Sequence, residues 1–272
     1  MHRDSIGKVR SFYKTESGIR WYCELRGKGE TVVLIPSGEG DCGSFSAVAD
    51  LLATKYQILT FDMPGFSRTS APKHFGSVSG DQTAQQIVAL LKALRIDRAV
   101  FYGCSSGGVF ALSIGALYSE CVKGVIVHEV AYAETRADGP LNQLGVLSDD
   151  EIPGSLAALF RENLNSNPIA WDALGMDFHD RLKANYVTWV RHYVAPAGGQ
   201  KLVREYVPEE LKKVPIAWTC GSLTEHSELI EFNQVLAAKA NVPLETLPCK
   251  HFPQVEIPEA LADHIRNQVT AF

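Results

Sequence analysis

The chain has 272 residues, of which 46% are hydrophobic and 21% charged, a balance typical of a soluble globular protein. Its formal net charge is −5 and no basic stripe is present, so nucleic acid is not an expected partner. No apolar run approaches the ~18 residues of a membrane span, and the N-terminal segment lacks the apolar core of a signal peptide. We therefore expect a cytoplasmic protein with no membrane partner.

The 6 cysteines are scattered and none forms a CxxC pair, so neither a zinc site nor a redox motif is predicted. In a chain of this size, unpaired cysteines are typical of buried thiols in a reducing compartment. No HExxH motif, phosphate-binding GxGxxG pattern or Walker lysine is present. We expect neither a metal ion nor a nucleotide cofactor.

In the first half of the chain, short apolar runs alternate with helical patterns, which favours a mostly parallel sheet covered by helices. The first strand is expected in a hairpin-like opening, and a second, β-branched run ends at the turn-forming stretch PSGEGD. Strands are expected over residues 18–27, 31–36, 56–62, 98–103 and 122–130, and helices over 45–54, 81–94 and 106–118.

The pattern changes between residue 133 and about residue 210, where helical stretches such as 155–163 and 170–193 occur without a convincing strand. Strands resume at 214–221 and 242–248, and the chain closes on a helix that begins near Pro258. A helical segment inserted between late strands is suited to covering a site at the strand ends, as a lid does.

Residues 103–107 read Gly-Cys-Ser-Ser-Gly, which has the form GxSxG. The motif follows an apolar strand pattern and precedes a helical pattern, the context in which its central serine acts as a nucleophile on a tight turn. The alternative is a glycine-rich turn without chemistry, which the flanking pattern disfavours. We predict Ser105 as the nucleophile, with Cys104 pointing back into the sheet.

A serine hydroxyl needs a base to take its proton. Of the 8 histidines, His251 is best placed, because it lies between the last strand and the last helix and follows the serine in the chain order Ser, acid, His. The other histidines are terminal, in a surface-like loop, within helical stretches or, for His128, at the end of a strand next to an acid.

Two glutamates compete for the role of the acid that orients His251. Glu129 ends the strand that follows the serine, and Glu225 lies after the strand 214–221. We predict Glu129 as the acid because it lies directly at a strand end, with Glu225 as the alternative. A residue that does not serve as the acid would be an ordinary charged loop residue.

Cleavage of an ester also needs donors for the oxyanion. One backbone N–H is expected from Ser106, the residue after the nucleophile. The other is expected from the loop after strand 31–36, where Gly38 allows the backbone to approach the substrate closely.

FDMPGFSRTSAP and the serine motif resemble the α/β-hydrolase superfamily, and the chain as a whole resembles the zearalenone hydrolases, which open a resorcylic acid macrolactone. The resemblance runs nearly end to end and includes GIRWYCE, VVLIPSGEGD, GCSSGG, HEV, RLKANYVTW, WTCG and HFPQV. It implies an α/β-hydrolase fold: a mostly parallel, about eight-stranded sheet with helices on both faces and a helical cap. The core would comprise residues 1–132 and 211–272, and the cap 133–210.

The resemblance also implies Ser105 as nucleophile, Glu129 as acid, His251 as base, and an oxyanion hole from the N–H groups of Gly38 and Ser106. It places Trp189 over the substrate, with Leu159 and Phe160 as apolar walls. For these three cap residues the alternative is packing of cap against core. The family's oxyanion loop commonly reads Pro-Asp-Gly, whereas this chain has Pro36-Ser37-Gly38, a departure that bears on substrate choice more than on reaction type.

The function expected from these features is cofactor-free hydrolysis of a small-molecule lactone or ester through an acyl-enzyme, with zearalenone as the substrate implied by the resemblance. Two alternatives stay open: an esterase for another aryl or lipid ester, and a small-molecule receptor with slow turnover. The resemblance further suggests a homodimer.

Overall fold

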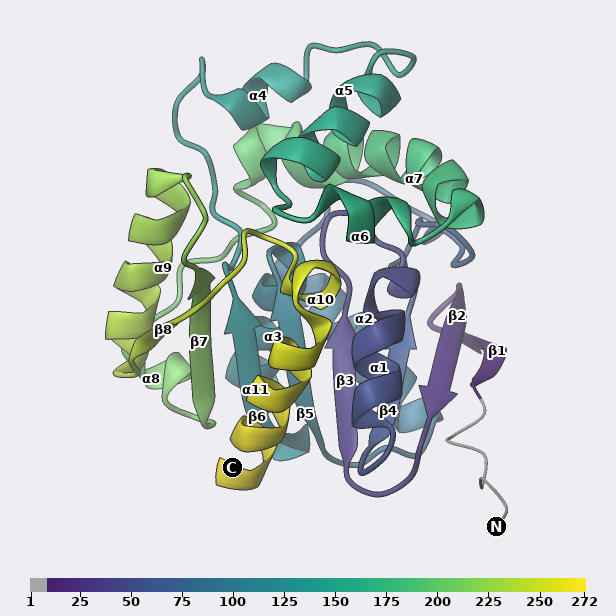
Figure 1. Ribbon diagram of the computed structural model, residues 1–272, viewed down its shortest axis with the longest axis vertical. Coiled ribbons are helices and arrows are strands. Elements are labelled where there is room, and N and C mark those ends of the chain that lie inside the picture. Colours follow the sequence, from purple (N-terminus) through teal and green to yellow (C-terminus); the bar gives the residue numbers. More distant parts are fainter. Residues whose placement is uncertain (1–8) are drawn as a thin grey trace.

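The computed structural model describes residues 9–272, which form an eight-stranded sheet covered by helices (Figure 1). The strands are β1 (Arg10–Glu16), β2 (Ile19–Arg26), β3 (Thr31–Ile35), β4 (Gln57–Phe61), β5 (Ala99–Cys104), β6 (Val122–His128), β7 (Ile216–Gly221) and β8 (Leu244–Leu247). Their order across the sheet is β1-β2-β4-β3-β5-β6-β7-β8. Strand β2 is antiparallel to both of its neighbours, and every pairing from β4 to β8 is parallel.

The α-helices within the described residues connect these strands or lie above their ends. They are α1 (Ser46–Leu52), α2 (Gly80–Ala93), α3 (Ser106–Leu117), α4 (Pro140–Leu144), α5 (Ile152–Ala158), α6 (Pro168–Asp172), α7 (Met176–Thr188), α8 (Pro208–Leu211), α9 (Ser227–Ala240), α10 (Pro253–Glu256) and α11 (Pro258–Ala271). From residue 9 onward, none of the helices combines the length and the apolar character needed to cross a bilayer.

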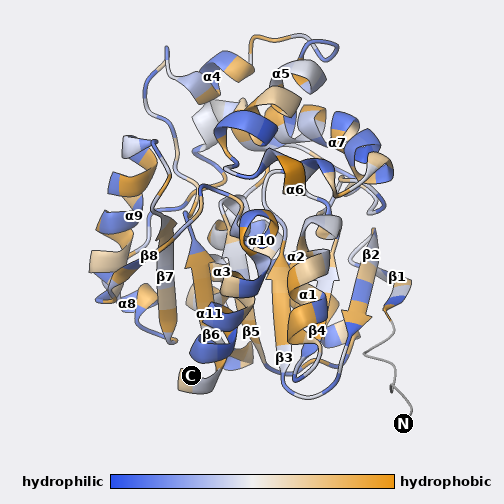
Figure 2. Ribbon diagram, viewed as in Figure 1, coloured by the Kyte–Doolittle hydropathy of each residue, from blue (hydrophilic) through white to orange (hydrophobic). Residues whose placement is uncertain are grey.

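Side chains of the central strands alternate between two hydrophobic layers, as the period of a β-strand requires. Val33 and Ile35 of β3 face the layer covered by α2 and α3, whereas Val32 and Leu34 face the layer covered by α1 and α11. Both faces of β3 are therefore buried, and β3 appears as a hydrophobic strand in Figure 2. This burial explains why β3 reads as an apolar run in the sequence.

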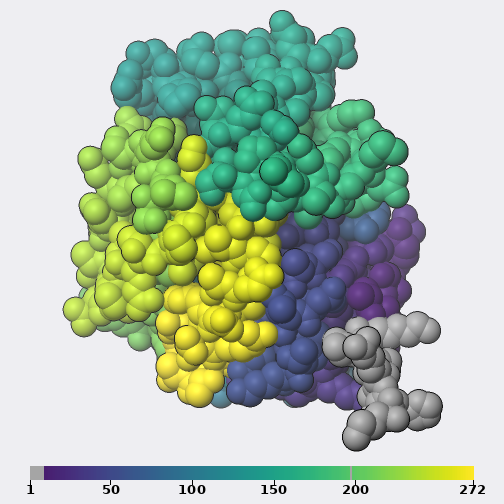
Figure 3. All heavy atoms as spheres, viewed as in Figure 1, coloured from purple at the N-terminus to yellow at the C-terminus, as the bar shows by residue number. Residues whose placement is uncertain are grey.

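Helices α4 to α7, which belong to the segment between β6 and β7, lie over the carboxyl ends of the parallel strands, whereas α8 of the same segment lies near the opposite end of β7 (Figure 1). Helices α5, α6 and α7 form a third hydrophobic cluster, centred on Phe160, Trp171 and Tyr186, whereas Tyr193 and Tyr206 of the same segment pack into the main core. The cluster extends to Phe252, which lies between β8 and α10. In Figure 3 the C-terminal part of the chain, coloured yellow, lies against the helical segment. The sheet, its two helical layers and this covering segment place a site at the carboxyl edge of the strands.

Two helical stretches differ in detail from the sequence expectation. The stretch 170–193 is broken, because Gly175 has φ +92° and ends the turn that follows α6. The helix that restarts as α7 widens into a π-helical turn at Trp189–Val194, and α5 likewise continues into a π-helical turn at Leu159–Asn163. Such turns often occur at functional sites.

Candidate active site

Ser105 lies on the sharp turn between β5 and α3. Its backbone has φ 55° and ψ −123°, a combination that costs energy for a residue with a side chain and persists only where the surroundings enforce it. The Ser105 N–H donates to the carbonyl of His128 at 3.0 Å, and its own carbonyl accepts from Ala131 at 3.1 Å. Both bonds fasten the turn to the end of β6.

Two glycines make this turn sterically feasible. A Cβ on Gly103 would lie 2.2 Å from the Gly107 carbonyl oxygen, and a Cβ on Gly107 would lie 2.4 Å from the Ile35 carbonyl oxygen. Because real Cβ atoms do not approach backbone this closely, only glycine fits at either position. The second contact also seats the start of α3 against the end of β3.

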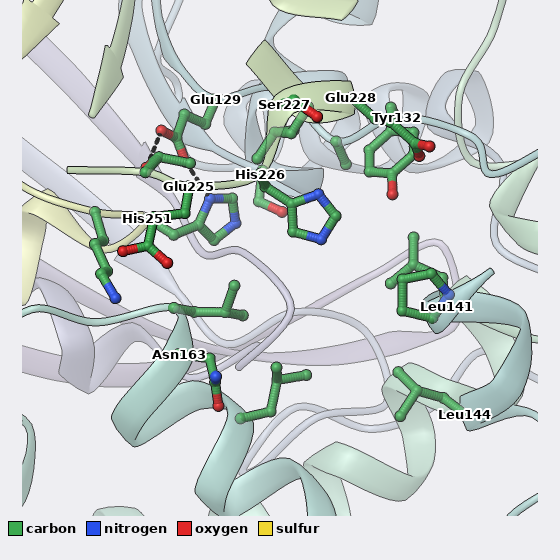
Figure 4. A pocket seen from close by; sticks show the side chains of 18 of the residues that line it. Glu129, Tyr132, Leu141, Leu144, Asn163, Glu225, His226, Ser227, Glu228 and His251 are labelled. Atoms are coloured by element: carbon green, nitrogen blue, oxygen red, sulfur yellow. Dashed lines mark hydrogen bonds and ion pairs between the residues drawn. The ribbon is translucent and has the colours of Figure 1, made fainter. Parts of the chain in front are cut away.

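His251 is held by a hydrogen bond from its ring to a buried carboxylate. Its Nδ1 lies 2.7 Å from Oε2 of Glu129 (Figure 4). The other Glu129 oxygen accepts from the amide of Gly221 at 2.8 Å and from the hydroxyl of Thr224 at 2.6 Å. Since Nδ1 is engaged, Nε2 is the ring nitrogen left for proton transfer.

Glu129 remains ionised although it is fully buried. Burial alone would raise the pKa of this carboxyl, but the hydrogen bond from His251 and the nearby imidazoles outweigh it and lower the pKa to about 2. A charged carboxylate against Nδ1 fixes the ring tautomer and stabilises an imidazolium. Glu225, the alternative acid, lines the same cavity as Glu129, but the ring of His251 bonds Glu129.

Three hydrogen bonds hold the loop that carries His251. The Cys104 thiol donates to the His251 carbonyl at 2.9 Å, and the His251 N–H donates to the carbonyl of Leu164 in the covering segment at 3.0 Å. His128, whose pKa is lowered chiefly by burial, places Nε2 3.1 Å from the Lys250 carbonyl. The sequence analysis did not predict these hydrogen bonds. The position of His128 directly before Glu129 was the one feature of the sequence that indicated a supporting residue.

Ser105, Glu129 and His251 line one cavity of about 780 Å³. Apolar side chains of the covering segment, among them Leu141 and Leu144, form one wall (Figure 4). Leu159 of the same segment also lines the cavity. The opposite wall is polar and comes from Tyr132, from residues 224–226 in the loop after β7 and from residues 227–228 at the start of α9 (Figure 4). Lys250 also lines the cavity. A largely apolar cleft with a few convergent polar groups is the usual form of a small-molecule site.

The two residues expected to form the oxyanion hole lie at the same edge. Gly38 lies in a tight turn closed by a 3.1 Å hydrogen bond from the Gly40 N–H to the Ser37 carbonyl. Ser106 is the first residue of α3, where a backbone N–H has no acceptor within the helix. Since Gly107 packs against the carbonyl oxygens of Ile35 and Pro36, the start of α3 and the Gly38 turn are neighbours.

Of the three cap residues expected at the substrate, two line the cavity and the third is buried behind it. Trp189 and Leu159 line the cavity, and the Trp189 indole also covers Gly38, where an added Cβ would lie 2.6 Å from the ring nitrogen. Phe160 is 1% exposed and packs against Trp171, Tyr186, Trp189 and Phe252 instead of lining the cavity. It supports the cavity from behind Trp189, whose ring it meets edge to face at a centroid distance of 5.6 Å.

One group of potential metal ligands occurs within residues 9–272, formed by Asp41, Cys42 and Asp62. Guanidinium groups already occupy its carboxylates: Arg68 bonds Asp62 at 2.6 Å, and Arg181 bonds Asp41 at 2.6 Å. The donor set is therefore that of an ion-pair network, and it lies apart from the residues that line the cavity.

Comparison with known proteins places this architecture in a family. The family model described as "Alpha/beta hydrolase family" matches residues 32–264. The chain belongs to the alpha/beta hydrolase family. This alpha/beta hydrolase is 37% identical over 263 residues to a zearalenone hydrolase of Cladophialophora bantiana, covering 95% of this chain and 96% of the relative. It is 35% identical to a zearalenone hydrolase of Bionectria ochroleuca, covering 95% and 97%.

Among solved structures, the enol-lactonase from Burkholderia xenovorans LB400 superposes with a TM-score of 0.75. The match covers 95% of this chain and 99% of that structure at 17% sequence identity. At this identity the superposition establishes a shared fold, and the expected mostly parallel eight-stranded architecture is confirmed.

Proposed function

We propose that this protein is a serine hydrolase that cleaves a lactone or ester bond, with Ser105 as nucleophile, His251 as base and Glu129 as the orienting acid. The observation that carries the proposal is the 2.7 Å bond between His251 Nδ1 and Glu129 in a cavity that is also lined by Ser105, whose φ is 55°. A buried carboxylate, an oriented imidazole and a strained serine form the arrangement that activates a hydroxyl.

The reaction proceeds through an acyl-enzyme. His251 Nε2 takes the Ser105 proton as the serine oxygen attacks the carbonyl carbon, and the oxyanion accepts hydrogen bonds from the N–H groups of Gly38 and Ser106. Collapse breaks the ester C–O bond, and His251 returns the proton to the leaving oxygen. Water then attacks the acyl-enzyme with His251 again as base, which releases the acid and restores Ser105.

The substrate class proposed is a resorcylic acid macrolactone such as zearalenone. The support is similarity to two zearalenone hydrolases at 35% and 37% identity over 95% of this chain. A cavity of about 780 Å³ with an apolar wall and a polar wall has the size and character for such a ligand. In a lactone the leaving oxygen stays tethered to the acyl group.

We assign residues 133–210 to the cap and residues 1–132 and 211–272 to the core. The cap contributes the apolar wall of the cavity through Leu141, Leu144 and Leu159. All 6 cysteines are free, which suits the reducing compartment expected for a cytoplasmic protein. The homodimer stays a prediction.

The experiment that tests the proposal is turnover of macrolactones and simple esters by the wild type and by Ser105→Ala. We expect the alanine variant to lose roughly 10⁴-fold or more of its kcat while still binding substrate, because no other group replaces the nucleophile. A variant that retains wild-type kcat would refute the assignment. A wild type that cleaves simple esters but not macrolactones would refute only the substrate class.

A further inference from the structure

One side of helix α7 follows the loop that carries Gly38. Arg181, Asn185 and Trp189 are spaced four residues apart, which places them on the same side of the helix. Their contacts run back along the loop in order: Arg181 bonds Asp41, Asn185 bonds the carbonyl of Glu39, and Trp189 covers Gly38. Successive turns of the helix therefore contact successive residues of the loop.

Asn185 is the central contact and is 1% exposed. Its Nδ2 donates to the Glu39 carbonyl at 2.8 Å and to the Ser67 hydroxyl at 2.7 Å, while its Oδ1 accepts from the Ser67 N–H at 2.8 Å. Both donor hydrogens of the amide are thus used. The Glu39 carbonyl and the Gly40 N–H belong to the same planar peptide, and that N–H donates to the Ser37 carbonyl at 3.1 Å. The Ser37 carbonyl in turn shares its peptide plane with the Gly38 N–H, so the direction of the Glu39 carbonyl is linked to that of the Gly38 N–H through this one hydrogen bond.

Other side chains hold the loop on either side of residues 38–40. The Ser67 hydroxyl donates to Asp41 at 2.7 Å, and Asp41 also pairs with Arg181 and Arg68. The buried Glu39 carboxyl accepts from the hydroxyls of Ser37 and Ser44. These bonds fix the ends of the turn, and Asn185 holds the Glu39 carbonyl in its middle.

We infer that Asn185 is a positioning residue for the oxyanion hole: α7 holds the Glu39 carbonyl and thereby aims the Gly38 N–H at the reacting carbonyl. The inference rests on the proposed hydrolase function. It makes the helical segment over the strand ends a structural part of the catalytic geometry rather than only a cover for the cavity. Asn185 itself does not line the cavity, so it acts through the loop.

The test compares Asn185→Ala and Asn185→Asp with the wild type. Alanine removes all three bonds, whereas aspartate keeps an acceptor for the Ser67 N–H but loses both donors to Glu39 and Ser67. Both variants are expected to lower kcat roughly 10- to 100-fold with KM within about threefold, because misplacing a catalytic group by about 1 Å has effects of this size. Lys183→Ala is the control, since Lys183 is an exposed residue of α7 that pairs only with Asp180.

A second readout separates positioning from general loosening. A trifluoromethyl ketone forms a tetrahedral adduct with the serine and places its oxyanion in the hole, so its affinity is expected to fall by the same factor as kcat. Melting temperatures are recorded for every variant, and assays are run well below them. Should Asn185→Ala not fold, Asn185→Ser takes its place, with the same loss of kcat expected because serine is too short to reach both partners.

The inference is overturned if the folded variants keep kcat within about twofold of the wild type, or if only KM changes. It is also overturned if Asn185→Asp matches the wild type, because the donors to the loop would then be irrelevant. A wild type that neither turns over esters nor binds the ketone would instead refute the proposed hydrolase function.

Discussion

Three donors converge on the Glu129 carboxylate: the ring of His251, the amide of Gly221 and the hydroxyl of Thr224. Such a set keeps a buried carboxylate charged and fixed in direction. The backbone of Glu129 has φ 42° and is held in that conformation by a hydrogen bond from the Glu129 N–H to the Thr219 carbonyl at 3.0 Å. At the residue scale, the orientation of His251 depends on this carboxylate.

Replacing Glu129 by glutamine tests that dependence. The amide can present its NH₂ group to Nδ1 and so favour the wrong ring tautomer, and we expect kcat to fall roughly 10³- to 10⁴-fold. Glu225→Gln is the matched variant, because Glu225 lines the same cavity without that bond. Steady-state kinetics on one ester decide the matter, and a larger loss in Glu225→Gln than in Glu129→Gln would contradict the assignment.

At the scale of elements, the turn between β5 and α3 depends on the absence of side chains at Gly103 and Gly107. Both glycines face backbone atoms, which cannot move aside as a flexible side chain would. Gly154 in α5 is the opposite case, an exposed helical glycine with no heavy atom within 4 Å of an added Cβ. The two kinds of glycine give a matched pair of substitutions.

We expect Gly107→Ala to lower the free energy of unfolding by more than about 2 kcal/mol, because the added methyl meets the Ile35 carbonyl and forces backbone to shift. Gly154→Ala is expected to raise it by about 0.5–1 kcal/mol, the usual gain of alanine over glycine in a helix. Urea unfolding measures both. Equal effects in the two variants would show that the turn is less tightly packed than described.

Local patterns in the sequence were sufficient to place the central strands and the serine turn, because an apolar run followed by GxSxG specifies a strand, a tight turn and a helix within a few residues. They were not sufficient for the helical segment. The break occurs at Gly175, a local signal that the predicted helix 170–193 passed over, and the π-helical turns at Leu159 and Trp189 do not follow from the helical period of the sequence. Phe160 shows the same limit: its sequence position does not reveal whether it faces the cavity or Phe252.

The candidate site shows this contrast as well. Chain order and strand ends were enough to choose Ser105 and His251 and to prefer Glu129 over Glu225. Thr224, Cys104 and Asn185 could not be chosen, because each acts on a partner far away in the sequence: Glu129, His251 and Glu39. Only the packed structure brings such pairs together.

At the scale of the whole molecule, charge is buried where the helical segment meets the core. Asp41 is paired with Arg68 and Arg181; burial raises its pKa, but these guanidinium groups outweigh that effect and lower it. Glu39, only two residues away, has hydroxyl partners instead, and burial raises its pKa. The pKa values of these two neighbouring carboxyls are therefore shifted in opposite directions, so their contributions to stability change with pH in opposite senses.

The Glu39 carboxyl predicts a pH-dependent stability. Its pKa in the folded protein lies above its ordinary value, so as pH rises past about 4.5 the unfolded chain ionises first and the folded state loses relative stability. The unfolding free energy of Glu39→Gln minus that of the wild type is thus expected to increase from about pH 4 to about pH 8. Urea titrations measure this difference, and a difference that is flat or falls with pH would contradict the burial effect.

The central claim is that Ser105 carries the acyl group. The most direct measurement is intact-protein and peptide mass spectrometry after rapid acid quenching of the wild type with a macrolactone. Because the leaving oxygen stays tethered, we predict an adduct equal to the full mass of the lactone, on the peptide that contains Ser105 and absent from Ser105→Ala. An adduct on another residue, or turnover by Ser105→Ala at the wild-type rate, would contradict the account.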